Sequence, residues 1–253
     1  MFIRYIYALN NLNLMSNSRY IVIFFVLILT HYRAEAQNNI LGGWYYINLN
    51  YHFNNKYFLY SELQTRSQHV ADDFYYREIK GGAGYKPTKN ISLLLGYGNY
   101  ATYTFPGNYN KPLQVNENRL WEQFIVSHNI DRFKFEHRVR IEQRWLNGDY
   151  NNRFRYRLNV AYPINHPKIT DHTFFVYGFD EVFFSNLDPY FIRNRILGGA
   201  GYRFSKTVTA QTGFIRQSDY KIGNVHSGKN FIQLALLLTA GHPDKEIRHS
   251  VDD

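Results

Sequence analysis

The sequence predicts an all-β protein that forms a single antiparallel transmembrane β-barrel of about 10–12 strands after a cleaved signal peptide. Three observations predict this fold class. The chain begins with an export signal, its later segments alternate between polar and apolar residues, and many of these segments exceed the roughly five or six residues usual in globular strands. The predicted division is a signal peptide over residues 1–36 and one β-barrel domain over residues 37–253.

The export signal has the three parts that secretion requires. Arg19 precedes a short apolar run over residues 21–30, and an A-x-A cleavage motif ends at Ala36. The apolar run is too short to span a bilayer as a helix, which argues against the alternative of an uncleaved anchor. Because the stretch before Met15 is long for the basic part of a signal peptide, Met15 is a second candidate for the start of the protein.

The composition suits one large β domain. The 253 residues include 23 Tyr, 20 Phe and 17 Gly but only 7 Pro, which favours strands and turns. The mean hydropathy of −0.44 is too low for a bundle of membrane helices. A membrane barrel keeps a low mean hydropathy because only every second residue faces lipid. The absence of cysteine excludes disulfides, thiolate metal sites and a cysteine nucleophile, and no cofactor is expected.

The formal net charge of +9 would also suit a protein that binds nucleic acid. The arginines are spread through strand-like segments, however, and the export signal directs the chain away from nucleic acid. We therefore predict outer-membrane lipid as the partner of this protein and the outer membrane as its location. Small anionic solutes are a second class of partner.

The alternation is clearest in two consecutive segments. In Phe133–Trp145, the even positions are mostly charged and the odd positions are mostly apolar. The next segment alternates arginines with Phe154, Tyr156 and Leu158. Weaker patterns predict further strands, and tight reversals are expected at connections such as Asn147-Gly148. Counting from Lys56–Arg66 gives about ten spanning strands with both ends on one side of the membrane, and Gly42–Asn50 is then left over, so that eleven or twelve strands are also allowed.

A soluble exported barrel would show the same alternation, with its aromatic residues inside and its arginines in water. Strand length, the export signal and aromatic residues near the segment ends favour the membrane barrel, because such barrels carry aromatic girdles at both interfaces. Candidates for these girdles are Trp44, Trp121, Trp145, Tyr162 and Tyr202. The soluble barrel is kept as an alternative.

Several motifs, taken together, resemble a known family. They are Trp44, Glu62-x-Gln64-x-Arg66, Leu95-Gly96-Tyr97-Gly98, Arg119-Leu120-Trp121-Glu122-Gln123, the stretch from His137 to Trp145, Phe154-Arg155-Tyr156-Arg157-Leu158, Asn194-Arg195 and Gly199-x-Gly201-Tyr202. The chain resembles the domain-of-unknown-function 2490 family, found largely in Bacteroidota and taken to be outer-membrane β-barrels. The resemblance covers nearly all of the mature chain and implies a fold and a location. It implies no activity and no catalytic residues.

The charged faces are expected to line the lumen, because a charge that faces hydrocarbon costs up to about 2–4 kcal/mol. The predicted lumen charge network comprises Glu62, Arg66, Glu136, Arg138, Arg140, Glu142, Arg144, Arg153, Arg155, Arg157, Arg193 and Arg195. Ion pairs among these residues would close the lumen and predict a structural or interaction barrel. The excess of arginine supports an alternative, a small porin-like passive pore or binding barrel for anionic solutes.

No catalytic motif is present, and we do not expect an enzyme. The sequence has no G-x-S-x-G and no H-E-x-x-H. Ser127 and His128 are adjacent, but neighbouring strand residues point to opposite faces and cannot form a catalytic pair. A hydrolytic site at the rim of the barrel is the remaining enzymatic alternative.

Overall fold

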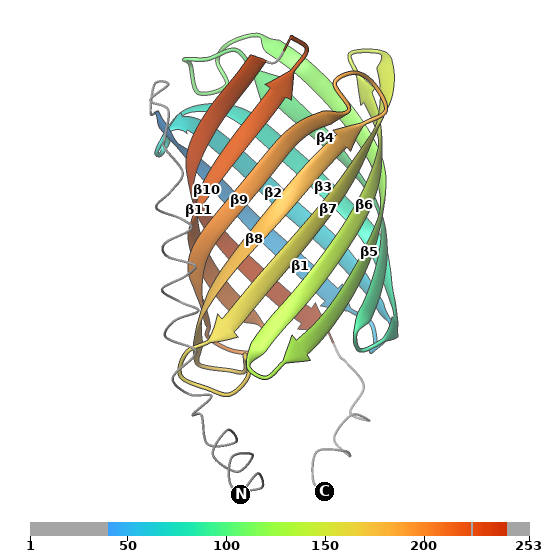
Figure 1. Cartoon of the computed structure of the whole chain (residues 1–253), viewed down its shortest axis with the longest axis vertical. Helices are drawn as coiled ribbons and strands as arrows, with labels where there is room; N and C mark the ends of the chain where they lie inside the picture. The colour runs from blue at the N-terminus through green and yellow to red at the C-terminus, as the bar shows by residue number, and fades with distance from the viewer. Residues whose placement is uncertain (1–39, 224, 242–253) are drawn as a thin grey trace, which may run out of the picture. The chain divides into compact units, whose positions relative to one another are not determined.

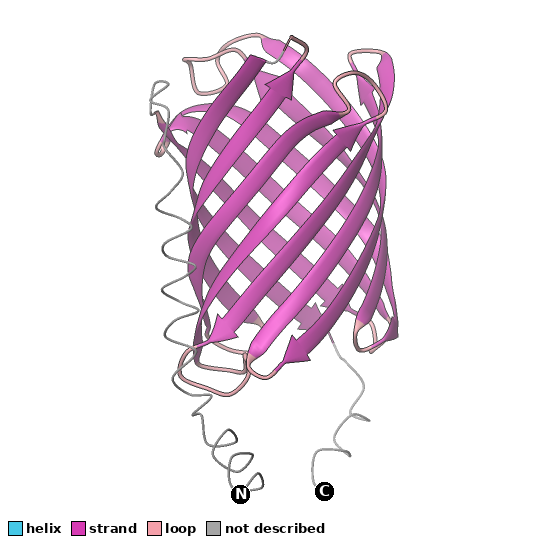
Figure 2. Ribbon diagram, in the orientation of Figure 1, coloured by secondary structure: helices cyan, strands magenta, loops and turns pink. Residues whose placement is uncertain are grey.

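The computed structural model describes residues 40–223 and 225–241, which form a closed barrel of eleven strands (Figure 1). The described segments are strands and loops (Figure 2), and none contains a helix long and apolar enough to cross a membrane. The strands are β1 (Leu41–His52), β2 (Tyr57–His69), β3 (Asp72–Thr88), β4 (Ile91–Tyr103), β5 (Leu113–Ile130), β6 (Phe133–Leu146), β7 (Asp149–Pro163), β8 (Thr173–Ser185), β9 (Phe191–Arg203), β10 (Val208–Lys221) and β11 (Val225–Gly241). The predicted all-β barrel of 10–12 strands is confirmed. The predicted signal peptide lies outside the described residues.

The barrel closes through one parallel pair of strands. β1 pairs with β11 along its whole length, from Leu41 opposite Asn230 to His52 opposite Gly241. The other ten pairs are antiparallel. The count of ten strands with both ends at one rim is therefore wrong. The segment that this count left over is β1, which makes the number odd, so the first and last strands run in the same direction.

The connections divide into two rims. Rim A carries the connections 53–56, 89–90, 131–132, 164–172 and 204–207, and rim B carries 70–71, 104–112, 147–148, 186–190 and 222–224. Each rim has one connection of nine residues. The lengths of the connections consequently do not distinguish one rim from the other.

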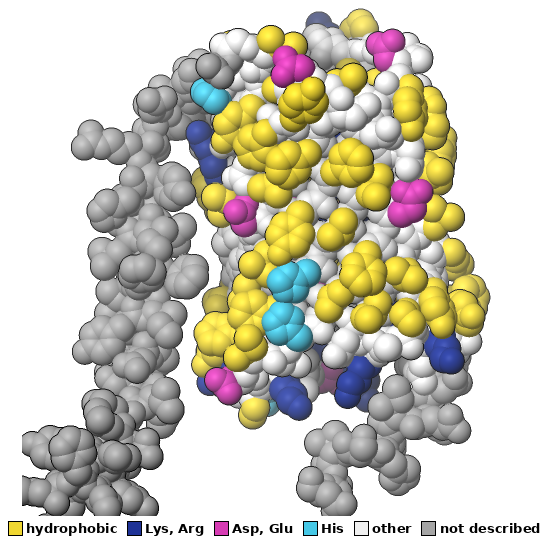
Figure 3. All heavy atoms as spheres, turned by 45° about the vertical axis from the view of Figure 1, so that its right-hand side comes forward, with side chains coloured by type: hydrophobic (Ala, Val, Ile, Leu, Met, Phe, Trp, Pro, Cys, Tyr) yellow, Lys and Arg dark blue, Asp and Glu magenta, His cyan; other side chains and the backbone are white. Residues whose placement is uncertain are grey.

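Alternation along the strands separates an inner wall from an outer wall. On β6, Arg138 and Arg140 line the lumen, whereas Val139 is 45% exposed on the outside. β7 follows the same rule, with Arg155 inside and Tyr156 outside. Figure 3 shows hydrophobic side chains spread over one outer face, where charged side chains are sparse. The inner wall is thus charged and the outer wall is mainly apolar.

Two of the expected girdle residues face the lumen instead. Trp44 and Trp121 are 6% and 0% exposed. Each lies an even number of residues from a polar residue that faces the lumen, Asn48 on β1 and Gln123 on β5, and so has the same inward parity, that is, it points to the same side of its strand. Arg66 stacks 3.4 Å from the Trp44 ring centroid, and Arg140 lies 4.3 Å from that of Trp121. The two tryptophans are therefore platforms for guanidinium groups. Trp145, Tyr162 and Tyr202 lie on strand positions of the outward parity, next to Tyr150, Phe133 and Phe174 respectively.

Candidate functional site in the barrel lumen

The lumen contains a cavity of about 930 Å³. All eleven strands contribute to its lining, which reaches from Lys89 and Asn90 beside rim A to Tyr75 and Lys229 beside rim B. The cavity is therefore a space inside the lumen where a ligand or water could lie.

The lining of the cavity is strongly basic. It includes sixteen Lys and Arg side chains but six Asp and Glu side chains, and a seventh carboxylate, Glu142, lies fully buried against them. The basic residues are Arg66, Lys80, Lys86, Lys89, Arg119, Lys134, Arg138, Arg140, Arg144, Arg153, Arg155, Arg157, Arg193, Arg195, Arg203 and Lys229. All twelve residues of the predicted charge network are part of this inner wall or, for Glu142, of the ion pairs behind it.

Glu142 on β6 gathers three arginines. Its carboxylate accepts from Arg153 Nε at 2.7 Å and from Arg155 Nη1 at 2.6 Å, and Arg140 Nη1 lies at 3.7 Å. The side chain of Glu142 is 0% exposed. A buried carboxylate in contact with three guanidinium groups holds β6 and β7 in one register, because a shift by one residue would turn the charges to the other wall.

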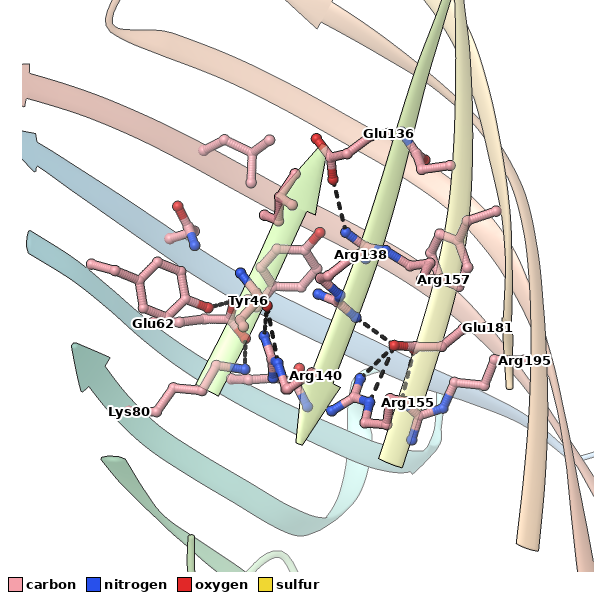
Figure 4. Close-up of a pocket in the computed structure, with 18 of the residues that line it drawn as sticks. Tyr46, Glu62, Lys80, Glu136, Arg138, Arg140, Arg155, Arg157, Glu181 and Arg195 are labelled. Carbon is pink, nitrogen blue, oxygen red and sulfur yellow. Dashed lines mark hydrogen bonds and ion pairs between the residues drawn. The ribbon is translucent and has the colours of Figure 1, made fainter. Parts of the chain in front are cut away.

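Glu181 on β8 is the second centre of the network. It contacts Arg138 and accepts from Arg155 Nη2 at 2.8 Å, while Arg195 Nη1 lies at 3.8 Å (Figure 4). Arg155 therefore bridges Glu142 and Glu181. Glu181 was not among the residues predicted for the network, because aromatic residues occupy both faces of β8 and obscure the alternation. Extending the period-two rule from Phe175, Tyr177 and Phe179 would have placed Glu181 inside.

A separate group of ion pairs connects β2 and β3. Lys80 Nζ lies 2.6 Å from Glu62 and 2.5 Å from Glu78. The phenol of Tyr60 donates to Glu62 at 2.7 Å, and that of Tyr76 donates to Glu78 at 2.5 Å. Glu62, which was predicted for the same network as the arginines of β6 and β7, pairs instead with Lys80, which lies directly opposite it in the register.

A third group lies on β5 and β6. Glu117 accepts from Arg119 Nε and from Arg144 Nε, each at 2.5 Å, and the guanidinium of Arg119 stacks 3.6 Å from the ring centroid of Tyr100. Arg144 was expected in the network, whereas Glu117 and Arg119 were not. They come from a segment whose inner face mixes charged residues with Trp121, which weakened the pattern.

Other contacts reach across the lumen between strands that are not neighbours. The Tyr60 ring on β2 lies 5.9 Å from Trp121 on β5, and Gln233 on β11 donates to the Tyr177 hydroxyl on β8 at 2.9 Å. Side-chain exposure is 0% at Glu142 and rises to 24% at Glu136 toward rim A and 27% at Arg193 toward rim B. The lumen is therefore narrowed by its own side chains.

These features define the class of protein: a closed β-barrel with a mainly apolar outer wall and a basic, ion-paired lumen. The chain belongs to the family described as protein of unknown function DUF2490, whose family model matches residues 41–227, from β1 into the beginning of β11. No curated protein and no solved structure matches the chain.

Proposed function

We propose that the protein is an outer-membrane β-barrel that serves as a structural or interaction barrel, with a lumen closed by paired Arg and Glu side chains. The observation that carries this proposal is the separation of the walls, with apolar side chains outside and ion pairs inside. A soluble barrel would be expected to have the reverse arrangement, because water solvates charges and its exclusion drives apolar burial.

The outer wall supports insertion into lipid. Leu63, Leu95 and Phe174 are 57%, 55% and 56% exposed, and similar side chains recur on every strand. Soluble monomers rarely expose contiguous apolar patches larger than a few hundred Å². Glu122 is a charged exception on this wall, and it accepts a hydrogen bond from Gln143 at 3.2 Å. The predicted signal peptide supports the same conclusion, because an outer-membrane protein must first be exported.

The number of strands and the contacts inside the barrel support a lumen that is blocked by side chains rather than an open channel. Barrels of about eight strands are filled by their side chains, whereas those of about 16–18 strands leave an aqueous channel. A barrel of eleven strands is closer in size to the barrels that side chains fill than to those that leave a channel. Contacts that reach across the lumen, such as Arg195 over the ring of Trp44 at 4.8 Å, narrow it further.

Cell fractionation tests the proposed location. We expect the mature chain in the outer-membrane fraction, extracted by detergent but not by high salt or carbonate, with Gln37 as its first residue by mass spectrometry. Recovery of the folded chain as a soluble periplasmic protein would contradict the proposal.

Bilayer conductance tests the closed lumen. The porin-like alternative is favoured by the sixteen basic side chains of the lining and predicts a steady, anion-selective current after insertion. We expect no steady current from the wild-type chain, once a lipid-flotation control has shown that the same preparation is inserted. A steady current would instead favour the pore.

A further inference from the structure

One wall of the lumen has more positive charge than its own carboxylates can neutralise. Among the described residues, six arginines on β6, β7 and β9 form ion pairs with three carboxylates, on β6 and β8. The arginines are Arg138, Arg140, Arg153, Arg155, Arg157 and Arg195, and the acids are Glu136, Glu142 and Glu181. The group on β2 and β3 is balanced by comparison, with Arg66 and Lys80 against Glu62 and Glu78. Because buried charges require partners, the unbalanced wall calls for an anion from outside the described strands.

Arg138 and Arg157 are the least satisfied pair of this wall. They lie directly opposite each other in the register of β6 and β7, and like charges at opposite positions repel. Arg138 has one carboxylate contact, to Glu181, and Arg157 lies 3.4 Å from Glu136. The Nε atom of each is buried without a hydrogen-bond partner. A guanidinium has five N–H donors, so this pair retains donors that no acceptor of the described chain occupies.

A third donor comes from the opposite wall. In the closed order of strands, β1 lies opposite β6 and β7, and Tyr46 of β1 lines the same cavity. Tyr46 lies within electrostatic range of Glu62, Tyr177 and Arg157, and no hydrogen bond of its hydroxyl occurs among residues 40–223 and 225–241. The Phe179 ring lies 5.1 Å beneath Arg157 and gives the guanidinium a flat support. Figure 4 shows Arg138 and Arg157 on neighbouring strands, with Glu136 beside Arg157 and Glu181 beside Arg138.

Rim A supplies a route for an anion to this pair. Lys86, Lys89 and Lys134 line the cavity there, and none of them forms an ion pair within the described part of the chain. A mouth lined by one sign of charge concentrates the oppositely charged ligand. At rim B, Arg144 and Arg193 are instead paired with Glu117 and Asp219.

From these contacts we propose that the lumen contains a binding site for a small, multivalent oxyanion, a free phosphate or polycarboxylate, held by Arg138, Arg157 and the hydroxyl of Tyr46. Planar guanidinium groups bind such oxygens in bidentate fashion. The site goes beyond the proposed function and does not depend on it, because anion binding requires the folded lumen and not the membrane.

Isothermal titration calorimetry of the purified, detergent-solubilised chain tests the site. Inorganic phosphate and citrate are the probes, titrated at constant ionic strength maintained with chloride. We expect saturable binding of at least one probe, and Arg157→Gln should weaken it about tenfold or more, as expected for the loss of charge-assisted hydrogen bonds. Arg193→Gln is the matched control, since Arg193 is a lumen arginine of similar exposure, 27% against 23%, that has Asp219 as its own partner.

The control variant removes the same charge from the same lumen, so its affinity should remain within about twofold of the wild type if specific contacts dominate. Equal weakening by both variants would show diffuse attraction and overturn the site, as would the absence of saturable binding. If Arg157→Gln does not fold, thermal unfolding of the wild-type protein tests the site instead. The site requires a higher Tm in phosphate or citrate than in chloride of equal ionic strength, and equal Tm values would refute it.

A lipid headgroup could offer the same phosphate chemistry, and a short-chain phosphatidic acid distinguishes it from a free anion. The free-anion site predicts that phosphate competes with this lipid and binds at least as tightly. Tighter binding of the lipid that Arg157→Gln abolishes would assign the arginine pair to a headgroup and overturn the proposal.

Discussion

Glu142 on β6 lies directly opposite Arg153 on β7, and its carboxylate also accepts from Arg155, two residues further along the same strand. The two strands form a hairpin across the Asn147-Gly148 turn. One fully buried acid thus connects two arginines that would otherwise repel each other. The stability of the lumen should depend on this acid more than on any carboxylate near a rim.

Replacement of Glu142 tests that dependence. Glu142→Leu leaves three arginines underpaired in a buried site, and we expect it to lower the free energy of unfolding by about 3–5 kcal/mol. Glu136→Leu is the matched control on the same strand, because Glu136 is 24% exposed and contacts Arg157 alone among the described residues. Its loss should be about 1 kcal/mol or less. Denaturant titration of both variants in detergent measures the difference, and small, equal losses would mean that water screens the whole lumen.

The alternation of charged and apolar residues along the strands was sufficient to predict the barrel and to place Arg138, Arg140, Arg155 and Arg157 on one face of their strands. It could not identify their partners, because register between distant strands is decided by the closed sheet and not by local sequence. Glu62 illustrates this limit, since only the pairing of β2 with β3 brings it to Lys80. Trp44 and Trp121 show a second limit. Aromatic residues occur on both walls here, so residue type alone could not separate a girdle from a platform for arginine.

The parallel closure between β1 and β11 predicts a specific cross-link. Ile47 and Leu236 are register partners, and both have the outward parity of their strands. The chain has no cysteine, so the double variant Ile47→Cys with Leu236→Cys gives a clean readout. We expect oxidation to join them, detected by a mobility shift that reductant reverses.

Ile47→Cys with Ile232→Cys is the matched control for this cross-link. Ile232 lies on the same strand and has the same parity, but its register partner is Gly43. The control pair is too far apart for a disulfide. Efficient cross-linking of the control, or none in the first pair, would contradict the parallel closure.

The turn between β6 and β7 predicts a local requirement for glycine. Asn147 and Gly148 have φ values of 48° and 102°, and two positive φ values are characteristic of the type I′ hairpin turn. Gly148→Ala should cost about 1 kcal/mol or more of unfolding free energy, because alanine is strained there. The control is Gly198→Ala, at a strand position where an added Cβ meets no atom within 4 Å. Thermal or denaturant unfolding compares the two, and an equal cost would remove the special role of the turn.

Tryptophan quenching by brominated lipid tests whether the outer wall contacts lipid while the inner wall does not. The chain has three tryptophans: Trp145 is 41% exposed on the outside, whereas Trp44 and Trp121 are buried in the lumen. In vesicles whose acyl chains are brominated near the headgroup, we expect quenching that Trp145→Phe largely removes and Trp44→Phe leaves in place. Quenching that survives Trp145→Phe, or a folded chain that stays in the aqueous phase with no quenching at all, would contradict this expectation.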